Sequence, residues 1–422
     1  MGDRAPRKRI FIVDHMCVLP YGHAQASVAL FRRTLGEHFS ESHALVPNVL
    51  SARSAKERGF TRSLNYPYNV YIYRRFDFLL NRCLRSKWLR VRLQDRLGLI
   101  EGGILRWMIG RFGFDGVLWN TERNWEKQFK RYSFGSDDLL FFPSADFYGA
   151  AACLDLLLKG KIRNPPRLHL RMIGVMENTC LGSKAACDLL LERVKKATAQ
   201  GIDVRLSAET PAYASYLAEK LGAVVTYFPQ PLGHDSVPMP ATEPRIAASM
   251  GSARRDKGYF LMMEIVRKTA HRCGNRVVFE IQSMPFDDDA FSSEYESELV
   301  TLPNSRVLPA VMEEGEMLEL FRRSYVAVLP YDAVVYKHRG SAILQEAIAF
   351  TRPVVCLGGA AFAPLVGRYK NGAVCRDVDG VAAAIEECAS ISPSEWDKRL
   401  AVSRRLYERD VEDAIARVLA EP

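Results

Sequence analysis

The chain has 422 residues, of which 48% are hydrophobic and 25% are charged, and its net charge is +9. These proportions are ordinary for a soluble globular protein and exclude a disordered chain, and the length favours two α/β domains of roughly 200 residues each. Nine scattered cysteines without a Cys-x-x-Cys pair indicate neither a disulfide framework nor a zinc site, so a reducing cytoplasm is expected.

The first elements alternate between strand and helix. An apolar strand over residues 9–14 is too short and too soon interrupted by polar residues to be a signal-peptide core. A loop through residues 20–23 and a helix over about residues 24–35 complete a βα unit, and a strand over residues 42–47 follows. No run approaches about 20 uninterrupted apolar residues, so no transmembrane helix is predicted.

A basic and aromatic stretch comes next. Residues 51–131 hold 18 Lys and Arg against 7 Asp and Glu, together with four of the five tryptophans. Apolar residues recur every four positions among arginines over about residues 75–97, which predicts an amphipathic basic helix. Such a composition suits an anionic membrane surface or single-stranded nucleic acid, and a helical lid with solvated arginines is the structural alternative.

Regular α/β alternation resumes after this stretch. The predicted elements are strand 138–143, helix 148–158, strand 168–175, helix 183–200, strand 203–207, helix 211–221 and strand 224–228. Five prolines within residues 229–244 indicate an interdomain linker.

The second half repeats the alternation. The predicted elements are strand 245–250, helix 259–271, strands 276–282 and 305–308, helix 314–323, strand 326–329 and a final helix 393–419. The loop between the first strand and helix carries Arg254, Arg255 and Lys257, at the edge where open parallel sheets bind ligands. Fixed cations there neutralise a diphosphate, whereas a solvated basic turn is the plain alternative.

The segment 331–355, YDAVVYKHRGSAILQEAIAFTRPVV, carries the clearest functional pattern. A Gly340-Ser341-Ala342 turn leads into a helix with one acidic residue, Glu346. Free backbone N–H groups at a helix start attract phosphate. Glu346 lies five residues after Ser341, within reach of a ribose whose phosphates sit at the turn. The pattern predicts a nucleotide-diphosphate pocket, although many αβ units share such a turn.

This segment resembles the donor-binding motif of family-4 retaining glycosyltransferases of the GT-B fold, in which two glutamates eight residues apart flank a small-residue turn. Glu346 matches the second glutamate, and the Arg-Pro-Val-Val run at 352–355 matches the usual close. His338 stands in place of the first glutamate. Arg254 and Lys257 are similar to the family's paired Arg and Lys before a Lys-Gly helix start.

The resemblance implies two Rossmann-like parallel-sheet domains facing across a cleft. Residues 1–235 would form the acceptor-side domain, with a basic helical insertion at about 51–135, and residues 236–395 would form the nucleotide-sugar domain. Helix 396–422 would return towards the first domain.

The resemblance also implies roles for individual residues. Arg254 and Lys257 would stabilise the departing nucleotide diphosphate, together with Gly340, Ser341 and Ala342, in place of a metal. Glu346 would bind the donor, and His338 would face its sugar. Arg339 and Lys337 beside it are phosphate or acidic-sugar contacts, or solvated loop charges.

Two further positions belong to the first half of the chain. Gly22 and His23 resemble the family's glycine-rich first turn, which approaches the donor phosphates, and a structural turn is equally compatible with them. Glu177 stands where many members carry a histidine facing the reacting sugar, so it would hold or deprotonate the acceptor hydroxyl, or cap the next segment. Asp146 is a second candidate, with helix capping as its alternative.

The sequence therefore predicts a retaining, metal-independent glycosyltransferase without a cofactor. Its donor would be a UDP- or GDP-linked sugar, and its acceptor a glycan or lipid-linked molecule in polysaccharide biosynthesis. The protein would be cytoplasmic, with residues 51–135 docking on the inner face of the cell membrane. The alternative keeps the fold without the chemistry, as a nucleotide-sugar-binding regulator or inactive partner subunit. Nucleic-acid binding has no supporting motif.

Overall fold

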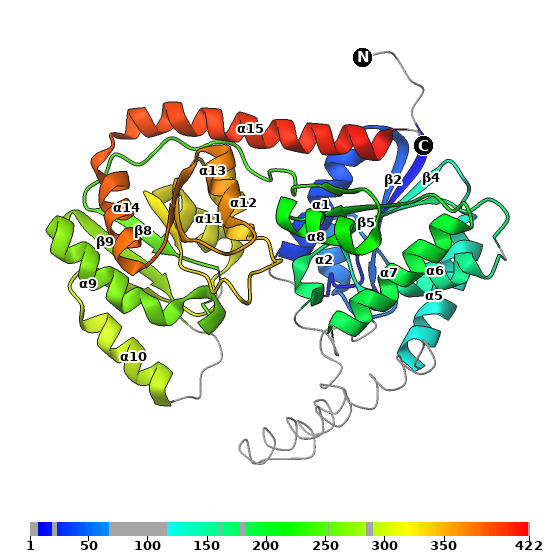
Figure 1. Ribbon diagram of the computed structural model, residues 1–422, viewed down its shortest axis with the longest axis horizontal. Coiled ribbons are helices and arrows are strands. Elements are labelled where there is room, and N and C mark those ends of the chain that lie inside the picture. Colours follow the sequence, from blue (N-terminus) through cyan, green and yellow to red (C-terminus); the bar gives the residue numbers. More distant parts are fainter. Residues whose placement is uncertain are drawn as a thin grey trace. The chain divides into compact units, whose positions relative to one another are not determined.

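The computed structural model describes residues 7–18, 23–66, 116–160, 162–177, 183–251, 253–283 and 290–420 (Figure 1). The chain divides into two compact units. Unit 1 consists of residues 1–209, 214–228 and 415–422, and unit 2 of residues 210–213 and 229–414. Each unit is built on its own β-sheet.

Unit 1 contains a seven-stranded sheet in the order β3-β2-β1-β4-β5-β6-β7, in which every described pairing is parallel. Its strands are β1 (Arg7–Val13), β2 (Phe39–Pro47), β3 (Thr61–Leu64), β4 (Asp138–Ala145), β5 (Arg167–Met172), β6 (Val204–Ala208) and β7 (Val225–Tyr227). Its helices are α1 (His23–Gly36), α2 (Ala52–Glu57), α5 (Gly116–Tyr132), α6 (Phe147–Leu158), α7 (Ser183–Ala199) and α8 (Pro211–Leu221). Residues 10–13 of β1 and 139–142 of β4, the central strands, are apolar and buried, because helices cover both faces of a parallel sheet.

Unit 2 contains a six-stranded sheet in the order β10-β9-β8-β11-β12-β13, and its described pairings are also parallel. The strands are β8 (Arg245–Ser249), β9 (Val277–Gln282), β10 (Ser305–Leu308), β11 (Val326–Leu329), β12 (Val354–Leu357) and β13 (Gly372–Cys375). The helices are α9 (Met262–Cys273), α10 (Ala290–Thr301), α11 (Glu314–Arg323), α12 (Ala342–Ala349), α13 (Ala363–Tyr369), α14 (Val378–Ser390) and α15 (Pro393–Leu419), whose residues from 415 onward belong to unit 1. Helices α9 and α14 pack side by side, and their apolar faces contribute to the core over the sheet (Figure 1).

In both sheets the strand order reverses once. The reversal lies between β1 and β4 in unit 1 and between β8 and β11 in unit 2. At such a switch point the loops after the two neighbouring strands diverge and leave a crevice at the carboxyl edge of the sheet, where ligands of open α/β folds bind.

The structure confirms the predicted class of two Rossmann-like parallel-sheet units. The insertion predicted as helical at about 51–135 also contains a strand, because residues 61–64 form β3, the edge strand that pairs with β2. Four residues are too few to show a strand pattern in the sequence. The predicted basic helix at 75–97 lies outside the described residues. Within the described residues, no helix combines the length and apolar character needed to cross a bilayer.

Two other boundaries differ from the prediction. Strand β5 ends at Met172 because Gly174 begins a 3₁₀ turn and donates its N–H to Glu209 Oε1 at 2.7 Å. The proline-rich stretch 229–244 groups with unit 2, where the carbonyl oxygens of Val237 and Pro238 accept hydrogen bonds from Arg352. The stretch is therefore packed chain rather than a free linker.

Candidate functional site

Two loops meet at the switch point of the unit 2 sheet. Residues 250–258 follow β8, and residues 330–341 follow β11 and lead into α12. The loops are joined by the backbone N–H of Asp332, which donates to the carbonyl oxygen of Asp256 at 2.9 Å. The sequence-predicted cationic loop and small-residue turn therefore lie on neighbouring strands.

Two glycines allow this close approach. Gly251 has φ +92°, and a Cβ there would lie 2.5 Å from Ile343 Cδ1 in the first turn of α12. Gly258 has φ +74°, and a Cβ there would lie 2.0 Å from the carbonyl oxygen of Pro330. Both positions have a left-handed backbone, which favours glycine. At Gly258 a side chain would meet a backbone carbonyl, whereas at Gly251 it would meet the flexible end of the Ile343 side chain.

A cluster of charged side chains fills the loops. Arg254 forms a bidentate pair with Asp256 at 2.8 and 2.9 Å and donates to the Tyr336 hydroxyl at 3.1 Å. Arg339 Nη1 lies 3.8 Å from Asp256 Oδ2. Burial favours protonation of Asp256, but the Arg254 hydrogen bond and the charges of Arg254, Arg339 and Lys257 outweigh it and lower its pKa. Three cations thus share one carboxylate, which leaves excess positive charge for an anionic ligand.

Lys257 is the most perturbed cation of the cluster. Its ammonium donates to the carbonyl oxygen of Gly251 and lies 5.9 Å from the centre of the Tyr331 ring. Burial lowers the pKa of Lys257 to about 7, and the charge of Arg254 acts in the same direction against that of Asp256. A phosphate beside this amine would favour its charged form.

The small-residue turn caps helix α12. Ser341 is the N-cap, and its hydroxyl accepts the backbone N–H of Leu344 at 3.3 Å. One N–H of the first turn is therefore satisfied by the cap. The other N–H groups at this end of the helix carry the positive end of its dipole.

Glu346 lies on the second turn of α12. Its side chain is 26% exposed, and Oε2 is 3.7 Å from Nε2 of His234. Oε2 itself is buried and accepts no hydrogen bond from the described part of the chain. Burial raises the pKa of Glu346 to about 7, and the charge of Glu314 adds to the shift.

Solved structures share this architecture. A UDP-forming trehalose-phosphate synthase from Burkholderia xenovorans is 12% identical over 97% of each chain, with a TM-score of 0.55. Sucrose-phosphate synthase from Thermosynechococcus elongatus is 14% identical over 97% of this chain and 96% of that chain, with a TM-score of 0.58. A glycosyltransferase from Rickettsia africae is 10% identical over 98% and 97%, with a TM-score of 0.59. The chain has the GT-B fold.

Comparisons of the sequence found no relative. No protein-family model matches it, and no curated protein matches it. At 10–14% identity the structural neighbours establish the GT-B fold alone, so the chemistry has to be argued from the residues.

The predicted donor-site residues fall in one region of unit 2. Arg254 and Lys257 lie after β8, Gly340, Ser341 and Ala342 lie at the start of α12, and Glu346 lies one turn further along. His338 is partly buried on the loop before that turn, whereas Lys337 is exposed. Arg339 joins the cluster through Asp256, which was not singled out in the sequence because a lone Asp between basic residues resembles an ordinary solvated turn.

The predicted sites of unit 1 are less complete. Gly22 and the side chain of His23 lie outside the described residues. Glu177 ends the 3₁₀ turn after β5, and its Oε1 accepts the Cys187 thiol of α7 at 3.2 Å. Asp146 caps helix α6, because its Oδ1 accepts the N–H of Gly149 at 2.8 Å. This is the capping alternative stated above, and the catalytic role of Glu177 stays a prediction.

Sequence reasoning singled out Asp146 but missed that it lies in a buried cluster with Asp14 and His15 at the unit 1 switch point. Asp14 and His15 follow β1, Asp146 follows β4, and all three are almost fully buried. His15 Nδ1 lies 3.7 Å from Asp146 Oδ2. Burial raises the pKa of Asp14 to about 7 and lowers that of His15 to about 3, so both side chains favour their neutral forms. For Asp14 and His15, only their place at a strand end marked them in the sequence.

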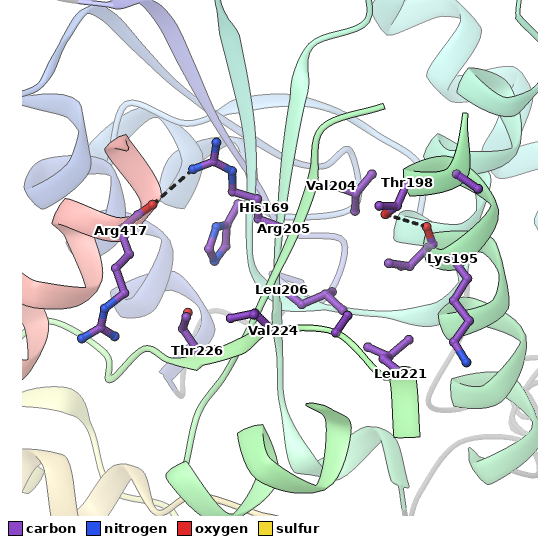
Figure 2. A pocket seen from close by; sticks show the side chains of 13 residues that line it. His169, Lys195, Thr198, Val204, Arg205, Leu206, Leu221, Val224, Thr226 and Arg417 are labelled. Carbon is purple, nitrogen blue, oxygen red and sulfur yellow. Dashed lines mark hydrogen bonds between the residues drawn. The ribbon is translucent and has the colours of Figure 1, made fainter. Parts of the chain in front are cut away.

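A hollow of about 610 Å³ in unit 1 does not coincide with either switch point. Val204, Arg205 and Leu206 of β6 all line it, and consecutive strand residues point to opposite faces. Figure 2 shows His169, Arg205 and Arg417 on one side of the strands and Thr198 and Leu221 on the other. The hollow therefore wraps around the amino edge of the sheet, opposite the edge where GT-B ligands are expected.

Proposed function

We propose that this protein is a glycosyltransferase that takes its sugar from a nucleotide-diphosphate donor bound by unit 2. The observation that most directly supports this proposal is the charged cluster of Arg254, Lys257 and Arg339 beside the start of α12, at the switch point of the sheet. The glycosyltransferase neighbours with the same fold support the same assignment.

The donor diphosphate would occupy the cationic end of this site. Arg254 and Lys257 would contact the phosphate oxygens, with the N–H groups at Gly340, Ser341 and Ala342 on the other side. As the bond to the sugar breaks, negative charge develops on the leaving diphosphate, and fixed cations stabilise that charge more than they stabilise the intact donor. These groups do the work that a metal ion does in other transferases, which supports a metal-independent reaction.

The nucleoside would extend along α12. The Glu346 carboxylate accepts hydrogen bonds from the ribose hydroxyls, five residues beyond the N-cap. His338 contacts the transferred sugar through a ring nitrogen, without the bidentate contact that a glutamate makes. We propose that transfer proceeds with retention, as in the family that the motif resembles.

The donor and acceptor are narrower proposals. A UDP- or GDP-linked sugar fits the diphosphate site. One structural neighbour is described as bound to UDP-2-fluoro glucose, which favours UDP. The basic aromatic stretch at 51–135 supports a lipid-linked or membrane-presented glycan, with the protein docked peripherally on the inner face of the cell membrane. The names of the neighbours, trehalose-phosphate and sucrose-phosphate synthases, instead favour testing sugar phosphates as acceptors too.

The test is release of the nucleotide diphosphate from UDP-, GDP- and dTDP-sugars, with sugar phosphates or a lipid-linked oligosaccharide pool as acceptors. We expect one donor to be consumed by the wild type and turnover to fall at least about 100-fold in Lys257→Ala and Glu346→Ala. Lys268→Ala serves as the control, because Lys268 is paired with Asp379 on the surface at α9. Undiminished turnover in Glu346→Ala would contradict the assignment.

A binding protein without turnover is the second candidate, and His338 in place of a glutamate favours it. The nearest carboxylate in the cluster, Asp256, is already engaged by Arg254 and cannot replace the missing group. This candidate predicts tight binding of a nucleotide sugar, lost in Lys257→Ala, with no product in any donor and acceptor combination.

A further inference from the structure

Glu346 has a neighbour that the sequence pattern does not contain. His234 comes from the proline-rich stretch before β8, and its Nε2 lies 3.7 Å from the buried Glu346 Oε2. This separation is within ion-pair range but longer than a hydrogen bond. Among the described residues, His234 is the only side chain that forms an ion pair with Glu346.

The imidazole is held by ring packing. The His234 ring lies 4.9 Å from the ring of Phe350, the residue that ends α12. Phe350 in turn stacks on Phe321 of α11 at 5.3 Å with an interplanar angle of 9°. His234 thus belongs to a row of packed rings between the end of α12 and α11, rather than to a free loop.

The backbone after His234 is fixed as well. Val237 O accepts from Thr351 Oγ1 at 2.6 Å and from Arg352 Nη1 at 2.9 Å, and Pro238 O accepts from Arg352 Nη2 at 3.1 Å. Met239 N donates to Asp397 Oδ1 at 2.8 Å. Three hydrogen bonds from the turn after α12 and one to α15 therefore hold this stretch in place, which restricts the position of His234.

We infer that His234 is a positioning residue for Glu346, and that the two side chains together recognise the ribose of the bound nucleotide. The imidazole lies beside Oε2 within ion-pair range and favours one orientation of the carboxylate plane, so that the remaining oxygen faces the ribose hydroxyls. Without this neighbour the carboxylate would be free to rotate, and no N–H group of the described residues would lie near its buried oxygen. Glu314 is the other charged group that acts on Glu346, and it is repulsive, so it cannot replace the histidine. This inference rests on the proposed function, because it needs a nucleotide at the site.

The test compares ribonucleotides with analogues that lack the hydroxyls. Binding of UDP and GDP, of their 2′,3′-dideoxy analogues and of inorganic pyrophosphate is measured by calorimetry on the full-length protein. In the wild type we expect the better ribonucleotide to bind about tenfold or more tighter than its dideoxy analogue, as for sites that pair a ligand hydroxyl with a buried polar group. Pyrophosphate reports on the Arg254 and Lys257 cluster alone.

Two substitutions separate hydrogen bonding from packing. His234→Phe keeps a ring against Phe350 but has no N–H, and His234→Gln has an N–H but no ring. We expect His234→Phe to reduce the ribose preference to about twofold or less, His234→Gln to retain most of it, and both to bind pyrophosphate as the wild type does. His271→Phe, at an exposed position on α9, is the control and should change none of these affinities.

The outcomes distinguish this inference from the proposed function. A ribose preference that persists in His234→Phe but is lost in Glu346→Gln overturns the role of His234 alone. A preference kept by His234→Phe and lost by His234→Gln also overturns it, because packing would then be the whole contribution. Failure of the wild type to bind any of the nucleotides overturns the proposed function and this inference with it.

Discussion

Burial shifts the pKa values of Lys257 and Glu346 towards the same value from opposite sides. Lys257 falls to about 7 and Glu346 rises to about 7, because each loses hydration of its charged form. A diphosphate requires the ammonium, so binding raises the pKa of Lys257 and affinity falls as pH rises through about 7. A ribose favours the carboxylate, so affinity also falls as pH drops below about 7.

We therefore expect nucleotide affinity to be bell-shaped around pH 7, with limbs that approach a tenfold change per pH unit. Calorimetry from pH 5.5 to 8.5 measures the profile. Lys257→Arg is the matched control, because arginine stays charged and should remove only the alkaline limb relative to the wild type. An alkaline limb that is identical in Lys257→Arg would show that another group titrates.

Asp14 gives a prediction about stability. Burial raises its pKa to about 7, so the folded state holds the Asp14 proton more tightly than the unfolded state does. The stability of the fold therefore falls as pH rises from about 4 to about 7, and the full penalty applies above 7. Asp14→Asn removes a charge that the buried site disfavours, and its amide oxygen can still accept the N–H of Met16.

We expect Asp14→Asn to be more stable than the wild type by about 1–3 kcal/mol at pH 8 and nearly equal at pH 4. Urea denaturation at pH 4, 6 and 8 measures the difference. His15 has the opposite dependence, since its pKa is lowered to about 3, but it is present in both proteins and cancels. Asp137→Asn, at an exposed position, should be neutral throughout, and a destabilised Asp14→Asn at pH 8 would mean that the ionised form is required.

At the scale of elements, Arg352 joins the end of α12 to the proline-rich stretch before β8. Its guanidinium is fully buried and donates to six backbone carbonyl oxygens, those of Val237, Pro238, Phe321, Arg322, Phe350 and Thr351. No carboxylate pairs with it within the described residues, and burial lowers its pKa to about 10. Carbonyl dipoles, assisted by the charge of Asp397, therefore hold this cation, which requires the planar fork of arginine.

We predict that Arg352→Lys costs about 3 kcal/mol of unfolding free energy, because lysine leaves buried carbonyls unpaired. The same change should weaken the preference for ribonucleotides over dideoxy analogues, since the segment that carries His234 is released. Arg399→Lys is the control, as its pair with Glu395 is exposed and contributes little. Chemical denaturation and calorimetry report the two effects separately. An Arg352→Lys variant as stable as the wild type would contradict the role of Arg352 in joining these segments.

Substitutions of glycine measure how tightly the loop after β8 packs against Pro330. Gly258 and Gly201 both have positive φ, at +74° and +78°, but a Cβ at Gly201 meets nothing within 4 Å. Gly201→Ala therefore measures the backbone cost alone, which we expect to be about 1 kcal/mol. Gly258→Ala adds a clash with Pro330 O and should lose at least about 1 kcal/mol more, together with pyrophosphate binding. Equal losses of stability in the two variants would show that the loop moves aside freely.

These elements also show what the sequence can predict. The alternation of strands and helices and the start of α12 are local patterns, and the elements that were predicted lie within a few residues of the observed ones. Strand β13 and helices α10, α13 and α14 were not predicted. Strand β3 was missed because four residues carry no periodicity. His234 and Arg352 acquire their meaning only when the stretch before β8 packs on α12, and Asp256 only when Arg339 arrives from the loop after β11. Contacts between distant segments leave no local trace.

At the scale of the molecule, the two units place titratable residues at equivalent topological positions. In each sheet the first strand and the fourth strand in chain order flank the switch point, and charged groups follow both, exposed or partly buried in unit 2 and buried in unit 1. In unit 2 these groups are cationic and suit phosphate, whereas in unit 1 they are Asp14, His15 and Asp146. The same architecture therefore presents two chemically different edges.

The net charge of the whole chain raises a last question, that of membrane docking. Residues 51–131 carry a net charge of +11, whereas the whole chain carries +9, so the remaining residues together carry −2. Residues 67–115 of this stretch lie outside the described part of the structure, so membrane docking is inferred from their composition. Each basic residue near an anionic surface contributes about 1 kcal/mol, so losing four should release a peripheral protein.

We expect the wild type to sediment with vesicles containing about 30% phosphatidylserine but not with neutral vesicles, and to be released by about 0.5 M salt, where charges are screened. Replacing Arg82, Arg85, Arg92 and Arg96 by glutamine should abolish sedimentation. The matched control replaces four exposed arginines of α15, at 399, 405, 409 and 417, and removes the same charge elsewhere. Equal loss in both variants would mean that net charge alone attracts the protein. Unchanged partitioning of the first variant, with salt-sensitive binding to oligonucleotides, would replace the membrane by single-stranded nucleic acid as the partner of this stretch.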